Sequence, residues 1–324
     1  MTDKFFVEDI EKVCLRIKVL GYPHNGESIM ISLTCEGKEL YNVVTDFYEV
    51  CDVHSWSNLL SNNTRINAFI WTHPDEDHSL GVKCLLDRFD PEGNAKIFIP
   101  TSLTKDFLVR NKKETALTTY LYLKEKYNKG QRYQWNEVSL IQDEAPRFLI
   151  SKKIIETTTN FSLDFKIGFM APISAISNRR TDVSNMSSGQ MNDISLFFIA
   201  QINGANYIFG GDLAKQTIQF LDEDYLNNCR FVKIPHHGSK DSIKLVDKIQ
   251  PIPSLKCHSV TTVFGETNPF DIVLDRYSEK SEYVYSTGRG EELFGIVEID
   301  YNVTNYDSYT LKLEGNAHQV RPSS

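Results

Sequence analysis

The segment WTHPDEDHSLG, residues 71–81, places two histidines and three acidic residues directly after the apolar run INAFI. The whole chain of 324 residues has eight histidines, so two within six positions is an unusual concentration. A buried strand that ends in such a loop brings imidazoles and carboxylates to one edge of a sheet, and both groups are good ligands for divalent ions. We interpret the loop as a metal-binding segment, with His73 and Asp75 serving one ion and Asp77 and His78 another. The alternative is a solvated acidic turn.

Two later segments also carry polar side chains after apolar runs. In FGGD, Asp212 follows NYIF, and the two glycines allow a close approach of the backbone. In KIPHHGSKDS, His236 and His237 follow a second apolar run. Alone, each is weak evidence, because a G-G-D turn is commonly just a turn and paired histidines can be one buried and one exposed residue. In a chain that also has the 71–81 loop, we expect one histidine of the pair to be a ligand.

The composition is that of an ordinary globular protein, with 41% hydrophobic and 24% charged residues. The net charge of −8 argues against a broad basic face for non-specific nucleic-acid binding, although a metal site can supply local positive charge. The six cysteines form no C-x-x-C pair, which favours reduced, buried thiols. The sequence has no apolar run of membrane-spanning length and no signal peptide, so we expect a soluble, cytoplasmic protein.

The order of apolar and polar segments predicts a layered α/β protein, in which strands come first, helices follow strands, and polar clusters lie at strand ends. Ser79 is a candidate cap for a helix over 81–89. We expect further helices over 57–62 and 214–226, and one or two over 104–130. The polar segment 174–193 is expected to be a loop, and residues 283–302 a terminal hairpin.

Taken together, H-x-D-x-D-H, G-D and H-H-G-S resemble the signature of metallo-β-lactamase-fold hydrolases, and most of all the hydrolase domain of ComEC-type competence proteins. The resemblance extends to G-E-S at 26–28, VTDFYE, NDISLFFI and YSTGRGEELFGIVEI, and so spans most of residues 17–300. It implies a four-layer αββα sandwich, formed by a single domain over 1–324 with an atypical insertion around 100–170.

The resemblance also implies a two-metal site at one rim of the sheets. Asp212 would bridge the ions, His237 is favoured slightly over His236 as the ligand of its pair, and Asp77 and His236 would take part in catalysis. The implied metal ligands are His73, Asp75, Asp77, His78, Asp212 and His237. The residues implied to orient ligands or contact substrate are Asp46, Asn192, Ser195 and Ser239.

Two positions depart from the pattern of these families. Asn192 stands where most of the wider superfamily has a histidine, as it does in the ComEC branch. The N-x-x-H-P element of ComEC-type domains is replaced by Glu266-Thr267-Asn268-Pro269, and His258 precedes the expected strand instead of following it. The missing histidine puts a phosphate or leaving-group contact in doubt, while the implied ligands are all present.

The implied activity is that of a two-metal phosphodiesterase, most simply a nuclease acting on DNA or RNA, with possible work in bacterial defence. Three histidines and three aspartates favour zinc or manganese, and magnesium is also compatible. Basic residues at 111–114, 178–180 and Arg289 could border a nucleic-acid groove or be merely solvated. The alternatives are a small-molecule metallo-hydrolase acting on cyclic nucleotides, phosphocholine esters, lactones or lactams, and a non-catalytic, metal-stabilised sensor. A protein partner or activator is compatible with the sequence, and the oligomeric state is left open.

Overall fold

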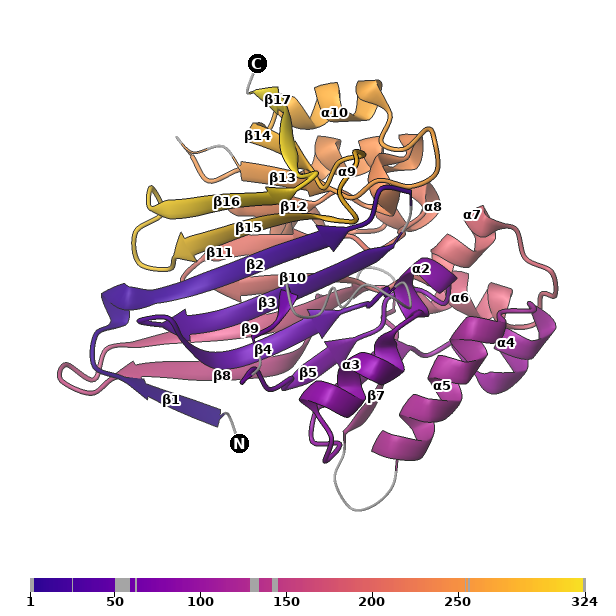
Figure 1. Ribbon diagram of the computed structural model, residues 1–324, viewed down its shortest axis with the longest axis horizontal. Coiled ribbons are helices and arrows are strands. Elements are labelled where there is room, and N and C mark those ends of the chain that lie inside the picture. Colours follow the sequence, from indigo (N-terminus) through magenta and orange to yellow (C-terminus); the bar gives the residue numbers. More distant parts are fainter. Residues whose placement is uncertain are drawn as a thin grey trace.

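The computed structural model describes residues 3–24, 26–49, 59–61, 63–128, 134–141, 145–253, 255 and 257–322. The described strands form two mixed sheets (Figure 1). Sheet A contains, in spatial order, β1 (Asp3–Val7), β8 (Arg147–Glu156), β9 (Ser162–Ala171), β10 (Phe197–Ile202), β11 (Ala205–Phe209), β12 (Cys229–Lys233), β13 (Cys257–Thr261), β14 (Ser281–Ser286) and β17 (His318–Pro322). Sheet B contains β16 (Tyr309–Gly315), β15 (Gly295–Asn302), β2 (Val13–Gly21), β3 (Glu27–Cys35), β4 (Lys38–Thr45), β5 (Ala68–Ile70), β6 (Lys96–Pro100) and β7 (Trp135–Val138).

Helices lie outside both sheets, and Figure 1 shows α8, α9 and α10 gathered away from α3, α4 and α5. The described α-helices are α2 (Glu76–Ser79), α3 (Val82–Phe89), α4 (Lys105–Arg110), α5 (Glu114–Tyr127), α6 (Ser174–Thr181), α7 (Ser188–Met191), α8 (Lys215–Ile218), α9 (Ile243–Lys248) and α10 (Asp271–Ser278). The 3-10 turns are η1 (Ile10–Lys12), η2 (Asn192–Ile194), η3 (Glu223–Tyr225), η4 (His236–Gly238) and η5 (Lys240–Ser242).

Three buried apolar clusters define the layers. The largest lies between the sheets, where Ile17 and Ile31 of sheet B share a cluster with Phe198 and Phe209 of sheet A. A second joins the outer face of sheet B to α3, α4 and α5, and a third joins sheet A to α8, α9 and α10. Each sheet is therefore apolar on both faces, as expected for sheets covered on both sides. The four-layer αββα sandwich is confirmed.

The sheets contain two parallel runs, β4-β5-β6-β7 and β11-β12-β13-β14. In each run, the loops that follow the strands emerge at one rim. The antiparallel neighbours β3 and β10 begin at the same rim. Segments that are distant in the sequence are thereby brought together where β4, β5, β11, β12 and β13 end.

Several local expectations are wrong. The 174–193 segment forms α6, α7 and η2 instead of a loop, and Ile194, which follows it, is buried within the cluster that lies over sheet B. The 283–302 segment is not a hairpin, because β14 joins sheet A and β15 joins sheet B. The helix expected over 214–226 shortens to α8 and η3. Ser79 ends α2, and Gly81 occupies the N-cap of α3. Residues 57, 58 and 62 of the helix expected over 57–62 lie outside the described residues.

The segment around residues 100–170, where an insertion was expected, contributes to both sheets. It supplies α4 and α5 over sheet B, β7 at the edge of that sheet, and β8 and β9 in sheet A. The cysteines within the described residues are all free, but only Cys229 and Cys257 are buried as predicted, whereas Cys84 is exposed and Cys14 and Cys35 are partly exposed. Among the described helices, none has the length and apolar character needed to cross a membrane.

Candidate metal centre

The 71–81 loop is held in shape by its own side chains before any ligand is considered. Trp71 Nε1 donates to Ser79 Oγ at 3.2 Å, and the Ser79 hydroxyl donates to the carbonyl of Asp75 at 2.6 Å. Between these contacts the chain forms the single turn of α2, in which Asp77 and His78 are buried. A buried loop with both donors and acceptors paired internally is rigid, so the position of its acidic and imidazole groups is fixed by the fold.

Three of the expected ligand histidines have the same arrangement. Each ring is buried, and each Nδ1 contacts a side-chain oxygen from another element. Such a contact fixes the ring orientation and leaves Nε2 for the interior of the site, which is how histidine ligands are commonly oriented. The contacts join His73 to Ser195 at 2.8 Å, His78 to Asp46 at 2.8 Å and His237 to Thr262 at 2.7 Å.

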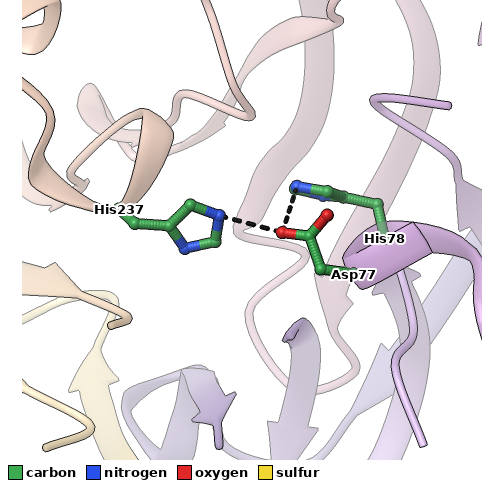
Figure 2. A group of neighbouring side chains, drawn as sticks. All are labelled: Asp77, His78 and His237. Carbon is green, nitrogen blue, oxygen red and sulfur yellow. Dashed lines mark hydrogen bonds and ion pairs between the residues drawn. The ribbon is translucent and has the colours of Figure 1, made fainter. Parts of the chain in front are cut away.

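The Nε2 atoms of two of these rings face the same carboxylates. Oδ2 of Asp77 lies 3.1 Å from Nε2 of His237 and 3.5 Å from Nε2 of His78 (Figure 2). Oδ1 of Asp212 lies 3.4 Å from Nε2 of His78 and 3.8 Å from Nε2 of His237. Asp77, His78 and His237 each offer a ligand atom, and those atoms all lie within 4.8 Å of one another. The four side chains come from three separate segments of the sequence and face one another.

Several polar atoms here are buried without a hydrogen bond among the described residues, namely Nε2 of His73, Nε2 of His78 and Oδ1 of Asp212. Unpaired buried polar atoms are costly and rare in folded proteins. A divalent ion would satisfy imidazole nitrogens and carboxylate oxygens together, and the His/Asp donor set suits such an ion. The residues therefore fit a metal.

His73 and Asp75 form the other part of the predicted cluster. Nε2 of His73 lies 3.3 Å from Oδ2 of Asp75, and the other carboxylate oxygen contacts the ammonium of Lys113, just before α5. Burial opposes ionisation of Asp75, but His73 and Lys113 hold its pKa well below the usual range. The Asp75 carboxylate is thus an anion that contacts both His73 of the cluster and Lys113 of the 100–170 segment.

Asp46, which was predicted to fix a ligand, is completely buried behind His78. Its Oδ1 accepts from the backbone N–H of Thr72 at 2.7 Å, and its Oδ2 accepts from the Thr72 hydroxyl at 2.5 Å and contacts His78. Burial raises the pKa of Asp46 while these contacts work in the opposite direction. The residue has a φ of 51°, in the left-handed region that non-glycine residues seldom adopt, so the fold holds it in a strained conformation.

The glycines beside the site allow two close approaches. Gly211, with a φ of 46°, would place a Cβ 2.8 Å from the carbonyl of Leu196, and Gly238, with a φ of 73°, would place one 2.5 Å from Cβ of Pro269. A side chain at either position would displace backbone next to Asp212 or His237. Gly211 therefore provides the close backbone approach that was expected from the two glycines of FGGD.

His236 and His237 have different surroundings. Both have left-handed φ values, 49° and 51°, which turn the neighbouring rings in different directions. His237 is buried and joins the cluster, whereas His236 lies within 3.2 Å of Asn192 and 3.0 Å of Ser239 through its Nδ1. Burial lowers the pKa of His236, so its ring is neutral at pH 7. Asn192 and Ser239 thus contact the histidine that was expected to act on substrate.

The charges at the centre are strongly coupled. Burial alone would raise the pKa of Asp212, but His78 and His237 hold it well below the ordinary value. Burial alone would lower the pKa of His78, and Asp77 and Asp212 instead raise it well above the ordinary value. Without a metal, His78 therefore keeps a proton between these carboxylates. A metal must displace that proton, so metal affinity falls as the pH falls.

A second group of acids and histidine, Glu27, Asp46 and His78, also lies within 4.8 Å. One atom of each member already has a partner: Nδ1 of His78 contacts Asp46, and Oε2 of Glu27 lies 2.5 Å from Nζ of Lys233, whereas Oε1 of Glu27 has no hydrogen bond among the described residues. This group shares His78 with the first one and fixes the orientation of that ring through Asp46. Glu27 and Lys233 were not among the predicted site residues, although a lysine inside the apolar run FVKIP is a signal that it needs a buried partner.

Three of the predicted basic groove residues make contacts within the protein. Besides Lys113, Arg180 forms an ion pair with the buried Asp193 at 2.7 Å, and Arg289 donates to backbone carbonyls that include that of Gly265 at 2.9 Å. Lys112 and Arg179 are exposed. Arg289 stabilises the turn that replaces the N-x-x-H-P element.

Comparison of the sequence with protein-family models and with curated proteins gives no match. Among solved structures, the chain is similar to the 1.98 Å crystal structure of Zn²⁺-bound PqqB from Methylobacterium extorquens. The two are 9% identical with a TM-score of 0.34, over 67% of this chain and 71% of that chain. A likeness this weak assigns neither a substrate nor a metal to this chain.

Proposed function

We propose that this chain is a metal-dependent hydrolase, a two-metal phosphodiesterase or nuclease acting on DNA or RNA. The observation that carries the metal part is the convergence of buried Nε2 and carboxylate atoms that lack hydrogen-bond partners, each histidine being oriented through its Nδ1. Buried polar atoms rarely lack partners, so several that face the same carboxylates indicate a site for a cation. Zinc or manganese suits the mixed His/Asp donors.

Under this proposal, Asp77, His78, His237 and Asp212 would hold one ion, and His73 and Asp75 would hold a second. Divalent ions held there supply Lewis acidity and activate water at neutral pH. Asp77 orients that water, and neutral His236 donates a hydrogen bond to the substrate. Asn192 and Ser239 orient the His236 ring.

The phosphodiester part rests on the resemblance and on cationic side chains beside the cluster. One cavity of about 310 Å³ is lined by Lys112 and Lys113, next to Pro74 of the 71–81 loop. Another of about 280 Å³ is lined by Arg180 and Lys215, next to Asp193. Acidic side chains line both cavities as well, so the surface suits a substrate whose phosphate is bound by the metals and by a few cations, not by a broad basic face.

The test is hydrolysis by purified protein supplied with Zn²⁺, Mn²⁺ or Mg²⁺, with EDTA as the metal-free control. Substrates are single- and double-stranded DNA and RNA, bis-p-nitrophenyl phosphate, a cyclic dinucleotide and a lactone. Cleavage of nucleic acid that requires metal and disappears in the Asp77→Ala/His78→Ala variant supports the proposal. Hydrolysis of the lactone without any phosphodiester would overturn the phosphodiesterase assignment, and a protein that binds no metal would overturn the whole proposal.

A further inference from the structure

A buried ion pair lies directly behind His237 and connects the two sheets. Lys233 is the last residue of β12 in sheet A, and Glu27 is the first residue of β3 in sheet B. Both side chains are completely buried, and Nζ of Lys233 lies 2.5 Å from Oε2 of Glu27. The Lys233 ammonium at this distance compensates the Glu27 carboxylate for the cost of burial. Glu27 is therefore an anion that can accept hydrogen bonds and has no proton to donate.

Thr262, immediately after β13, connects this pair to the site. Its hydroxyl donates to Oε2 of Glu27 at 2.8 Å, and its oxygen lies 2.7 Å from Nδ1 of His237. A hydroxyl has one proton, and that proton is committed to a carboxylate. The Thr262 oxygen can then only accept from His237, so Nδ1 of His237 must carry a hydrogen.

The proton at Nδ1 determines what the other ring nitrogen can do. Nε2 of His237 faces Oδ2 of Asp77 at 3.1 Å. With one hydrogen on Nδ1, the ring can face that carboxylate oxygen in two ways: a second hydrogen on Nε2 donates to Asp77, or Nε2 presents a lone pair and a cation lies between or beside the two acceptors. In the second arrangement, the Nε2 side of His237 is a cation-binding position.

We propose that Lys233, Glu27 and Thr262 form a positioning relay that keeps the hydrogen of His237 on Nδ1 and reserves Nε2 for the metal. The relay deepens the proposed function and rests on it for the identity of the cation. It differs from the contacts of the other two histidines, because the oxygen that receives the Nδ1 hydrogen is itself fixed by a buried ion pair.

The test uses Thr262, because removing either charge of the buried pair risks unfolding. Thr262→Val keeps the shape and removes the hydroxyl, and Thr262→Ser restores it. Thr261→Val is the matched control, because Thr261 is an equally buried neighbour whose hydroxyl donates to the carbonyl of Thr262. The first readout is the exchange-protected Nδ1–H proton of His237 in NMR spectra of the metal-free protein. The second is metal affinity by chelator competition.

The parent, Thr262→Ser and Thr261→Val are expected to retain the Nδ1–H signal, and Thr262→Val to lose it. Metal affinity in Thr262→Val is expected to fall about 10- to 100-fold, as for other groups that orient a metal-binding histidine. A signal that persists in Thr262→Val would overturn the relay. A parent that shows the signal and binds no metal would support the proton assignment and overturn the proposed function instead.

Discussion

His237 and His258 are both buried, at 1% and 3% exposure. His237 comes after β12, and His258 belongs to the neighbouring strand β13 of sheet A. His237 lies at the rim among carboxylates, with Nδ1 bound to Thr262 and Nε2 facing Asp77. His258 lies within β13, where Nδ1 contacts the Tyr301 hydroxyl at 3.0 Å and the ring of Tyr309 is 4.4 Å away. Burial alone therefore does not mark a candidate ligand. The position at the carboxyl end of a strand, with acids opposite Nε2, does.

The contrast extends to charge. Acidic neighbours raise the pKa of His78, whereas burial and the nearby Arg230 lower the pKa of His258 to about 4. His258 is thus a neutral member of an aromatic cluster that contains Tyr283, Tyr285, Tyr301 and Tyr309. Its Nε2 is also without a hydrogen bond among the described residues, yet the carboxylate of Glu282 lies 3.8 Å away. An isolated orphan nitrogen does not make a metal site, whereas several that converge do.

The largest expected effect comes from exchanging the same side chain at the two kinds of position. His78→Gln should reduce metal-dependent hydrolysis by on the order of 1,000-fold or more, because a single essential member of a catalytic unit accounts for most of its effect. His258→Gln should retain the parent activity. Steady-state kinetics and metal content by atomic spectroscopy check both. Equal losses in the two variants would show that the Gln substitution acts through folding and would remove the distinction between the histidines.

Lowering the pH should reduce the free energy of unfolding, because His258 is neutral in the folded protein. Its pKa is 6.5 in the unfolded chain and about 4 in the folded one, so the unfolded state binds the proton more tightly between these values. The corresponding stability is complete above pH 6.5 and is lost as the pH falls to about 4. At ~1.4 kcal/mol per pKa unit, the loss is on the order of 3 kcal/mol.

Urea unfolding of the parent and of His258→Phe between pH 4 and 7 measures this loss. The variant should show a shallower fall of unfolding free energy with acid. Tyr301→Phe is the control, because it removes the hydroxyl that contacts His258 and leaves the titrating ring in place. Parallel curves for the parent and His258→Phe would contradict the assignment.

A substitution at Asp46 tests whether this residue orients a metal ligand or only stabilises the fold. Asp46→Asn should weaken metal binding about 10- to 100-fold, because the amide no longer fixes the Nδ1 hydrogen of His78. Asp90→Asn is the matched control, since Asp90 is also buried and accepts from backbone N–H groups at 2.8 and 2.9 Å, but in the loop after α3. Chelator competition and thermal unfolding distinguish the two. Loss of stability without loss of affinity in Asp46→Asn would make it a structural residue.

The rim and its residues were predictable because the information is local. The apolar run followed by H-x-D-x-D-H fixes a buried strand and a polar loop, and the parallel order of the strands brings Asp212 and His237 to that loop. Long-range pairings were not predictable. Nothing near Lys233 in sequence identifies Glu27 as its partner, and β14 and β15 read as a hairpin because sheet membership depends on partners elsewhere in the chain. Likewise, polar 174–193 contains short helices stabilised by tertiary contacts, such as Arg180 with Asp193.

The smallest effect concerns Lys113, which contacts Asp75 on the side away from His73. Removing this partly exposed ammonium makes the acidic centre more attractive to a cation, whereas the charge that acts on His258 is the cation of Arg230. Lys113→Met should therefore tighten metal binding by up to about fivefold, the range of a partly exposed ion pair, and the effect should shrink at high ionic strength. Lys112→Met is the control, because Lys112 lines the same cavity. Weaker metal binding in Lys113→Met would show that Lys113 chiefly orients the Asp75 carboxylate instead of competing for its charge.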